Sequence, residues 1–247
     1  MRVAALYDIH GNLPALEAVL EEVRQSGIDR VIVGGDVVPG PMPRETIEHL
    51  LSLDLPVQFI RGNGDRDVLA RMRGIETGAV PEPFREAIRW SGAQIRDHEA
   101  LLDSWPATLS LEIPGIGVTL FCHATPRSDT EIFTRRTPDD RLLPMFEAVD
   151  AALVVCGHTH IPFDRTIGRT RVVNAGSVGM SFSGPGAYWM LLDRDVQLRR
   201  TAYDLDGAAE RIRTTGYPQA DDFATRSVLR PPSEEETLDA FARAELK

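Results

Sequence analysis

Cysteine is scarce in this chain of 247 residues, which contains only Cys122 and Cys156. Each stands just ahead of a histidine in the sequence. With so few cysteines, we interpret both as reduced core residues on neighbouring strands. A disulfide between them, or a thiolate metal ligand, is the alternative.

Long apolar runs are also missing. No stretch approaches the roughly 20 residues that a membrane-spanning helix needs. The chain begins Met1-Arg2 and enters a strand-like run at once, so no signal peptide is expected. These features predict a cytoplasmic protein with no membrane partner.

A basic excess is absent as well, because 27 Lys and Arg stand against 37 Asp and Glu, a net charge of −10. This balance disfavours a broad binding surface for a nucleic acid polymer or an anionic membrane. The hydrophobic share of 43% and the charged share of 26% are those of an ordinary globular protein. The length predicts a single domain over residues 1–247 with a core of its own.

The first sixty residues alternate between strand and helix patterns. Short apolar runs at 3–7, 31–33 and 57–60 are typical of strands. Between the first two, Asn12 stands at an N-cap position and apolar residues then recur at helical spacing up to Gly27. A second helix is predicted at about 44–53. This alternation favours parallel strands joined by right-handed crossovers.

The middle of the chain, at about 66–105, has a helical pattern without a strand signal, and we interpret it as a helical cap inserted beside the site. The remainder is rich in strand signals, beginning with a hairpin of residues 108–113 and 118–121 around Pro114-Gly115. A second sheet packed on the first is therefore expected. Further strands are predicted at 153–156, 171–173, 188–192 and 197–203, and a terminal helix at about 233–247.

Seven residues with oxygen or nitrogen donors follow the apolar runs. If strand geometry continues, Asp8 and His10 point the same way, because alternate residues share a face. Asp36 and Asn63 follow the next two strands, and the ends of neighbouring parallel strands meet at the edge where ligands gather. The full set is Asp8, His10, Asp36, Asn63, His123, His158 and His160.

Histidines are concentrated in the same places, with four of the six in these motifs. A single histidine of this kind is more often a hydrogen-bonded, partly buried side chain. The combination of imidazole, carboxylate and amide donors instead predicts a site for divalent cations. His49 and His98, outside the motifs, are interpreted as solvated surface residues.

Taken in order, the motifs Asp8-Ile-His10, Gly35-Asp36, Gly62-Asn63-Gly64-Asp65, His123 and Gly157-His158-Thr159-His160 resemble those of the calcineurin-like metallophosphoesterase superfamily. The form Asp8-Ile-His10-Gly11-Asn12 is similar to its small bacterial and archaeal phosphodiesterase branch. The resemblance runs from Asp8 to about Ser177, including Asn174-Ala-Gly-Ser177. The last seventy residues carry no recognisable motif.

The resemblance implies an α/β fold, a four-layer α-β-β-α sandwich of two mixed sheets. It also implies two metal ions, one held by Asp8, His10 and His160 and the other by Asn63, His123 and His158. Asp36 would bridge both ions, and a hydroxide between them would attack phosphorus in line. Manganese is favoured, with Fe, Zn, Ni or Co as alternatives.

The sequence departs from the family pattern at Gly64, where many members have a histidine thought to protonate the leaving group. Protonation is then weaker, is left to solvent, or comes from another residue such as His98 in the cap. This predicts a preference for substrates with good leaving groups. The alternative is that Gly64 only relaxes a tight turn.

Several neighbouring residues are candidates for supporting roles. Asp65, which we group with Asp36, Asn63 and His123 as catalytic, either orients a ligand histidine or caps the following helix. Asn12 has the same two alternatives and is also a candidate for substrate binding. Guanidinium groups match phosphate oxygens, so the candidate phosphate contacts are Arg61, Arg66, Arg127, Arg135 and Arg136.

The leading functional hypothesis is a two-metal enzyme that hydrolyses small phosphodiesters, including cyclic nucleotides. A phosphomonoesterase using the same site is the nearest alternative. A non-catalytic metal-binding scaffold is a different class, favoured only by Gly64. A nuclease is disfavoured by the acidic balance. The terminal helix after Pro232 leaves room for a homo-oligomer.

Overall fold

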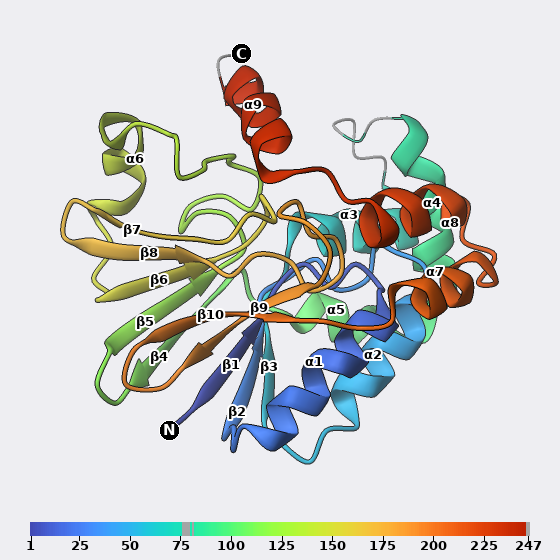
Figure 1. Cartoon of the computed structure of the whole chain (residues 1–247), viewed down its shortest axis with the longest axis horizontal. Coiled ribbons are helices and arrows are strands. Elements are labelled where there is room, and N and C mark those ends of the chain that lie inside the picture. Colours follow the sequence, from blue (N-terminus) through green and yellow to red (C-terminus); the bar gives the residue numbers. More distant parts are fainter. Residues whose placement is uncertain (76–79, 81, 246–247) are drawn as a thin grey trace.

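The computed structural model describes residues 1–75, 80 and 82–245. Its first sheet is built mainly from the N-terminal part of the chain and is completed by two later strands (Figure 1). The parallel strands are β1 (Val3–Leu6), β2 (Arg30–Val33) and β3 (Val57–Phe59). Strand β9 (Ala187–Leu192) runs antiparallel to β1, and β10 (Val196–Thr201) runs antiparallel to β9. The order is β10-β9-β1-β2-β3.

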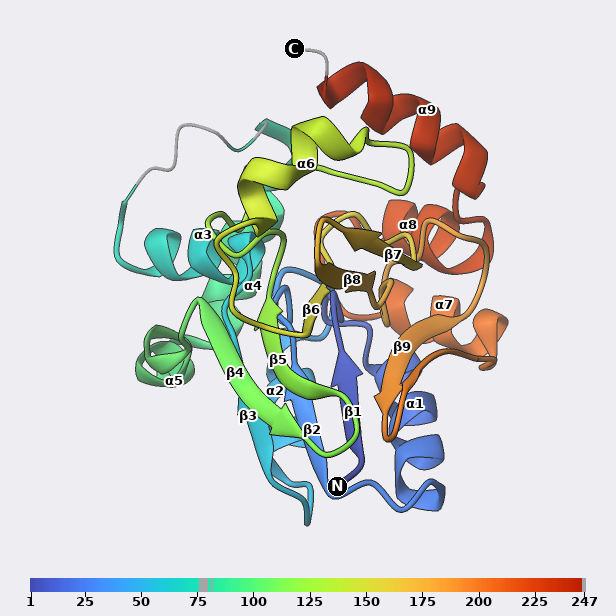
Figure 2. The same cartoon turned by 90° about the vertical axis from the view of Figure 1, so that its left-hand side faces the viewer.

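The second sheet also has a parallel centre. Its strands are β4 (Thr108–Ile113), β5 (Gly117–Cys122), β6 (Leu153–Cys156), β7 (Phe163–Ile167) and β8 (Thr170–Asn174), in the order β4-β5-β6-β8-β7. Strands β5, β6 and β8 are parallel, while β4 and β7 are antiparallel at the two edges. In Figure 2, β4 and β5 lie in front of the first sheet. The predicted α/β fold of two mixed sheets is confirmed.

Alternation along the strands divides the apolar residues between layers. In β1, Ala4 and Leu6 belong to the core between the first sheet and its helices, whereas Val3 and Ala5 belong to the core between the sheets. A third core, including Phe146, lies on the outer face of the second sheet. Because strand residues alternate between faces, a sheet with cores on both sides needs apolar residues at every position.

Helices of the N-terminal half cover the outer face of the first sheet. Helix α1 (Leu13–Gln25) begins at the Asn12 cap and buries its apolar stripe there, next to α2 (Pro43–Leu51). The chain between β3 and β4 forms α3 (Asn63–Met72), α4 (Glu82–Gln94), the short η1 (Arg96–His98) and α5 (Glu99–Ser104). Residues 76–79 and 81 of the predicted cap lie outside the described residues.

Later helices complete the molecule. Helix α6 (Asp139–Phe146) packs on the second sheet. Helix α7 (Leu205–Arg213), the short α8 (Ala220–Phe223) and η2 (Ala224–Leu229) add to the helical layer of the first sheet. Helix α9 spans Glu234–Glu245, and residues 246–247 of the predicted terminal helix lie outside the described residues.

Strand β7 and helices α6 to α8 are not predicted from the sequence. Strand β7 lies at a sheet edge, and only Phe163 and Ile167 at its ends are buried, so its apolar pattern is weak. Helix α6 contains Pro144, which obscures a helical pattern.

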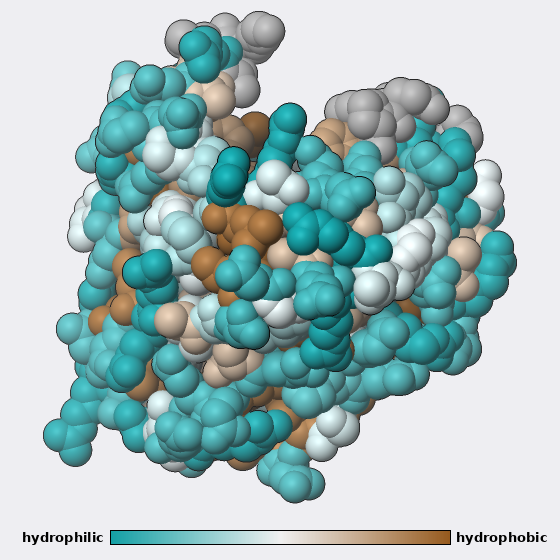
Figure 3. Space-filling model, turned by 45° about the vertical axis from the view of Figure 1, so that its right-hand side comes forward, coloured by the Kyte–Doolittle hydropathy of each residue, from teal (hydrophilic) through white to brown (hydrophobic). Residues whose placement is uncertain are grey.

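Within the described ranges, no helix combines the length and apolar character needed to cross a membrane. In the space-filling view of Figure 3, most of the visible face is hydrophilic, and hydrophobic residues gather in a small patch near its centre.

Candidate metal centre

Five of the predicted ligands lie on loops with a left-handed backbone. The φ angles are 53° at Asp8, 49° at His10, 51° at Asp36, 68° at His158 and 57° at His160, and no other described non-glycine residue has a positive φ. Such conformations cost roughly 1–3 kcal/mol each and concentrate at functional sites. The expectation that strand geometry continues through Asp8 and His10 is therefore wrong, because β1 ends at Leu6.

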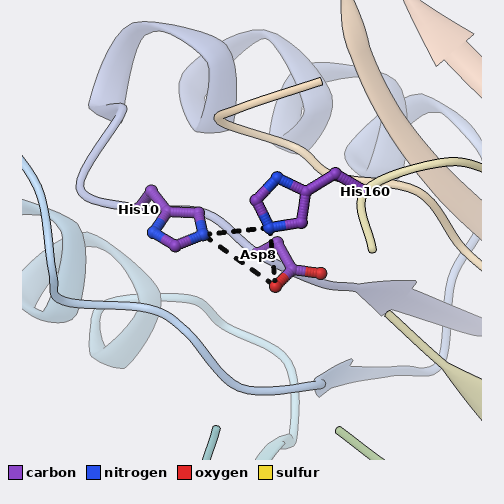
Figure 4. Close-up of side chains that lie close together, drawn as sticks. All are labelled: Asp8, His10 and His160. Carbon is purple, nitrogen blue, oxygen red and sulfur yellow. Dashed lines mark hydrogen bonds and ion pairs between the residues drawn. The ribbon is translucent and has the colours of Figure 1, made fainter. Parts of the chain in front are cut away.

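Asp8, His10 and His160 form one cluster of ligand atoms (Figure 4). His160 Nε2 lies 3.3 Å from Asp8 Oδ1 and 3.2 Å from His10 Nε2. His10 Nε2 lies 3.9 Å from Asp8 Oδ1. The loop after β1 and the loop after β6 supply these residues, so the cluster joins the two sheets.

A second cluster contains Asp8, Asp36 and His123. His123 Nε2 lies 3.6 Å from Asp36 Oδ1 and 3.9 Å from Asp8 Oδ1. The other carboxylate oxygen of Asp36, Oδ2, lies 3.9 Å from His10 Nε2 in the first cluster. Both carboxylates therefore stand between the two groups of imidazoles.

Asn63 and His158 lie beside the second cluster. The end of the Asn63 amide is 3.1 Å from His123 Nε2 and 3.0 Å from His158 Nδ1. In the orientation that satisfies its hydrogen bonds, the amide nitrogen occupies this position and donates to both rings. In the opposite orientation the amide oxygen faces both ring nitrogens, which is a favourable set of donors for a cation.

Backbone carbonyl groups orient three of the four imidazoles. In each of the three, Nδ1 lies within hydrogen-bond distance of a carbonyl oxygen: His10 with Pro39 at 3.1 Å, His123 with Gly34 at 3.0 Å, and His160 with Met180 at 2.6 Å. An Nδ1–H that donates to a carbonyl leaves the Nε2 lone pair directed at the cluster. This pairing is the usual support of a metal-ligating histidine.

The Asp8 carboxyl group is fully buried. Burial opposes its ionisation, but the nearby charges of His160, His123 and His10 hold the pKa of this carboxyl below its ordinary value. Its Oδ2 accepts the backbone N–H of His158 at 2.9 Å, whereas no donor is aligned with the buried Oδ1. A buried carboxylate oxygen without a donor, facing three imidazoles, fits a bound cation.

The charge states of His158 and His10 agree with this fit, whereas at His123 burial is outweighed by the charges of Asp36 and Asp8, which raise the pKa of that ring. Burial, followed by the charge of His123, lowers the pKa of His158 to about 4. Burial, followed by the charge of His160, also lowers the pKa of His10. Both rings are therefore neutral near pH 7, the form in which imidazole binds a metal.

Asp65 supports the loops through the backbone. Its carboxylate accepts the N–H groups of Val37 at 2.8 Å, Val38 at 3.2 Å and Gly62 at 3.0 Å, and no described imidazole is hydrogen-bonded to it. Burial and then the charge of Asp36 raise the pKa of Asp65 to about 7, while these N–H groups favour the carboxylate. Asp65 thus caps α3 and ties it to the loop that follows β2.

The Asn174-Ala-Gly-Ser177 segment holds two ligand loops. Asn174 Nδ2 donates to the Gly157 carbonyl at 2.6 Å, and Ser177 Oγ donates to the Asp8 carbonyl at 2.7 Å. A Cβ atom at position 157 would lie 2.4 Å from Asp8 Oδ2, so glycine is required where the two loops approach each other.

Gly64 lies within the first turn of α3 and does not have a positive φ, so the tight-turn interpretation is wrong. Its N–H donates to Asp36 Oδ1 at 2.7 Å. A Cβ atom here would lie 2.5 Å from Pro39 Cγ and 3.0 Å from Asp36 Oδ1. This position therefore has no space for a side chain as the loops are packed.

Two cavities adjoin the clustered ligands. The apolar cavity, of about 420 Å³, is lined by His10, Asp36 and Asn63 together with residues of α4 and of the chain from Tyr217 to Ser227. The polar cavity, of about 320 Å³, is lined by His123, three arginines and residues 125–129. Two cavities of different character, both bordered by Arg66, therefore adjoin the candidate ligands in the described structure.

The candidate arginines have different environments. Arg61, Arg66 and Arg127 line the polar cavity, where Arg66 pairs with Asp129 and Arg127 pairs with Glu131 at 2.6 Å. Arg135 and Arg136 instead pair with acidic residues of α9 and line neither cavity.

Two other predicted residues lie away from the cavities. His98 Nε2 is 3.8 Å from Glu48, and His98 lines neither cavity, so it is not placed to protonate a leaving group. The buried Asn12 caps α1 by accepting the Ala15 N–H at 3.3 Å, and it donates to the Gly179 carbonyl at 2.8 Å.

The cysteines are free and buried on neighbouring strands, as predicted. Burial raises the pKa of the Cys122 thiol, which disfavours a thiolate ligand. Sequence reasoning missed Phe182, whose ring stacks on His160 with centroids 4.6 Å apart. It also missed the apolar cavity residues, because their spacing is the same as that of core residues.

Two mixed sheets that gather carboxylate, amide and imidazole donors in the loops after their strands define an α/β protein with a candidate metal centre. The chain belongs to the calcineurin-like phosphoesterase superfamily, whose domain matches residues 1–196. It is thus a calcineurin-like metallophosphoesterase of a metal-dependent family, as the ordered motifs predict.

Similar proteins come from bacteria and archaea. The uncharacterized protein MJ0912 of Methanocaldococcus jannaschii is 30% identical, covering 88% of this chain and 94% of that protein. Phosphodiesterase YfcE of Escherichia coli K12 is 28% identical, covering 79% and 89%. A metallophosphoesterase structure from Sphaerobacter thermophilus aligns with a TM-score of 0.71 and 26% identity, covering 92% and 97%. The fold is also that of PH1004 from Pyrococcus horikoshii OT3, with a TM-score of 0.78, 22% identity and coverage of 94% and 99%.

Proposed function

We propose that this protein is a two-metal phosphodiesterase acting on small phosphodiesters, including cyclic nucleotides. Asp8, His10 and His160 hold one ion, and Asn63, His123 and His158 hold the other. The observation that carries the proposal is the buried Asp8 Oδ1, which lacks an aligned donor and faces three imidazoles that carbonyl groups or packing hold in place.

Asp36 is the residue that would contact both ions when they are bound. One of its oxygens faces His123 at 3.6 Å and the other faces His10 at 3.9 Å, so one carboxylate reaches both groups of ligands. Asp8 Oδ1 faces both groups too, and its negative charge adds to that of Asp36. Two carboxylates between two dications offset their mutual repulsion.

When bound, two divalent ions would lower the pKa of a coordinated water and neutralise charge on the phosphoryl oxygens. The residues of the chain perform the positioning. The N–H of Gly64 fixes Asp36 Oδ1, and Asp65 fixes the loop that carries Asp36. Arg61, with Arg66 and Arg127, places positive charge in the polar cavity beside His123, where it attracts a phosphate ester.

The two cavities favour a diester over a monoester. A diester carries two alcohol groups on phosphorus, and candidate ligands line each of the two cavities. Position 64 offers no acid, and His98 is not placed to supply one. Departure of the alcohol therefore relies on its own acidity or on solvent, so aryl esters are the better substrates.

Elemental analysis combined with a panel of phosphate esters tests the proposal. Purified protein reconstituted with manganese should hold two ions per chain and hydrolyse bis(4-nitrophenyl) phosphate faster than 4-nitrophenyl phosphate. A faster monoester reaction would replace the proposal with a phosphomonoesterase. Iron, zinc, nickel and cobalt are compared in the same assay, since the donor set does not select manganese by itself.

Asp36→Asn distinguishes the enzyme from a non-catalytic scaffold. The amide keeps the shape of the side chain but removes the bridging charge, so activity should fall at least about 10³-fold. Asp54→Asn is the matched control, because Asp54 is exposed in the segment between α2 and β3. If wild-type protein loaded with two ions shows no activity on any ester, the scaffold is the better description. Cytoplasmic location and homo-oligomer formation stay predictions.

A further inference from the structure

The apolar cavity has two walls that approach each other beside the ligands. One wall is Phe84, Ala87 and Ile88 of α4, and the other includes Tyr217 and Phe223 from the segment around α8. These walls come from parts of the sequence more than a hundred residues apart, and neither carries a family motif. His10, Asp36 and Asn63 line the same cavity, so a molecule inside it touches the proposed ion ligands directly.

The aromatic residues of the second wall pack against neighbouring rings. The rings of Tyr217 and Phe223 are perpendicular, with centroids 6.2 Å apart, and Trp90 of α4 lies edge-on to Tyr217 at 5.4 Å. Tyr217 is 9% exposed and Phe223 is 4% exposed, so most of each ring is already packed. Aromatic side chains held in this way present a preformed apolar surface at little entropic cost.

The charges of this cavity do not suit an anionic group. Arg66 is its one basic lining residue besides the ligand His10 among the described residues, and Arg66 pairs with Asp129 and Asp67. Asp67 and Asp222 also line the cavity. A second phosphate or a carboxylate placed here would face these two carboxylates, and the cations beside them, Arg66 and Arg226, are already engaged in ion pairs with them.

We propose that the apolar cavity binds an uncharged aromatic or alkyl ester group, so that the substrate is a phosphodiester of at least one apolar alcohol. This inference rests on the proposed function and narrows it. The phosphate lies at the ion ligands, and the polar cavity with Arg61 takes the second ester group. A volume of about 420 Å³ is in the usual range for small-molecule sites and accommodates an aromatic ring with substituents.

Binding of phosphonates to manganese-loaded protein tests the inference without turnover, since a C–P bond is not hydrolysed. Calorimetry compares methylphosphonate, phenylphosphonate and 4-carboxyphenylphosphonate. Burial of the ring should make phenylphosphonate bind about tenfold more tightly than methylphosphonate. The added carboxylate should remove most of that gain, because it meets Asp67 and Asp222.

Phe84→Ala locates the effect. Phe84 is 53% exposed at the rim of the cavity, so its truncation should leave the fold intact. The tenfold preference for phenylphosphonate should fall to about threefold, with methylphosphonate binding unchanged. Leu198→Ala is the matched control, because Leu198 is 41% exposed on β10 and does not line the cavity. The Leu198→Ala variant should keep the tenfold preference for phenylphosphonate over methylphosphonate.

The outcomes separate this inference from the proposed function. Equal binding of methyl- and phenylphosphonate by protein that holds two ions overturns the inference and leaves the metal site standing. Equal binding of phenyl- and 4-carboxyphenylphosphonate also overturns it, since the cavity then accepts charge. Protein that retains no metal and binds no phosphonate overturns the proposed function together with the inference.

Discussion

The loops of the two sheets contribute different donors to the ligand cluster. The first sheet supplies three candidate oxygen ligands, Asp8, Asp36 and Asn63, with one imidazole from His10. The second sheet supplies three imidazoles, His123, His158 and His160. All of the formal negative charge thus comes from one side. Neither sheet alone offers a complete set of donors for one of the proposed ions, so metal affinity would depend on how the sheets pack.

The same comparison applies to the supports of these ligands. On the first sheet, Asp65 and Gly64 fix the loop of Asp36 through backbone N–H groups. Two imidazoles of the second sheet, His123 and His160, are instead oriented by the carbonyl oxygens of Gly34, which follows β2, and Met180. Anionic ligands are held by donors and imidazoles by acceptors, as their chemistry requires. Substitutions of candidate ligands on the first sheet and on the second sheet should therefore have different effects on metal binding.

The largest expected effect follows from removing charge on the first sheet. Asp8 faces both groups of imidazoles. Asp8→Asn should therefore weaken the binding of both ions and lower kcat/KM by at least about 10³-fold. His160→Asn on the second sheet should remove one ion and lower kcat/KM by about 10²-fold. Manganese content per chain checks the difference. Equal losses of metal in the two variants would contradict the division between sheets.

A smaller effect is expected at Gly64. In Gly64→Ala the new Cβ meets Pro39 Cγ and Asp36 Oδ1, which should reduce the free energy of unfolding by about 1–3 kcal/mol. Pro39→Ala should relieve part of this clash. Thermal unfolding of the two single variants and of the double variant therefore measures the interaction free energy between positions 39 and 64. If the stability changes of the two single variants simply add in the double variant, the loop that carries Pro39 and the start of α3 can move apart without cost.

Phe182 is the next test, on the side of the second sheet. Phe182→Ala removes the ring stacked on His160 and should weaken manganese binding about three- to tenfold. Phe241→Ala is the control, because this ring lies 6.5 Å from Phe182 and has no ring contact with His160. Calorimetric titration with manganese measures both. An equal effect of the two substitutions would indicate a general loosening of the fold.

The smallest expected effect is at Arg127. This side chain is about half exposed and pairs with Glu131, so Arg127→Ala should raise KM for a diester less than about threefold. Arg61→Ala, in the same cavity, should raise KM more. Steady-state kinetics on one diester compares the two. A larger effect at Arg127 would reverse this ranking of phosphate contacts.

Sequence periodicity was sufficient for the strands of the sheet centres and for the helices with a clear apolar stripe. Strands β1, β2 and β6 are buried on both faces and read as continuous apolar runs. The edge strand β7 and the Pro144-containing α6 lack such patterns, since partial exposure or a helix-breaking residue removes the signal.

The seven residues proposed as ligands lie close together in the structure, and the sequence could single them out because chemistry restricts which residue types bind cations. Two features were not accessible from the sequence. The left-handed loops depend on packing at the strand ends, and the cavity wall at Tyr217 and Phe223 uses residues that also belong to the core. Apolar residues beside a cavity and apolar residues within a core obey the same periodicity.

The left-handed loops have a consequence for saturation mutagenesis. At Asp8, His10, Asp36, His158 and His160, the best-folded inactive variants should be glycine and asparagine, and the poorest should be valine and isoleucine. Two to five residues upstream, in β1 and β6, the order should be reversed: valine and isoleucine should be tolerated best, and glycine and asparagine worst. A proteolysis-based abundance screen would display this reversal without any knowledge of substrate or metal.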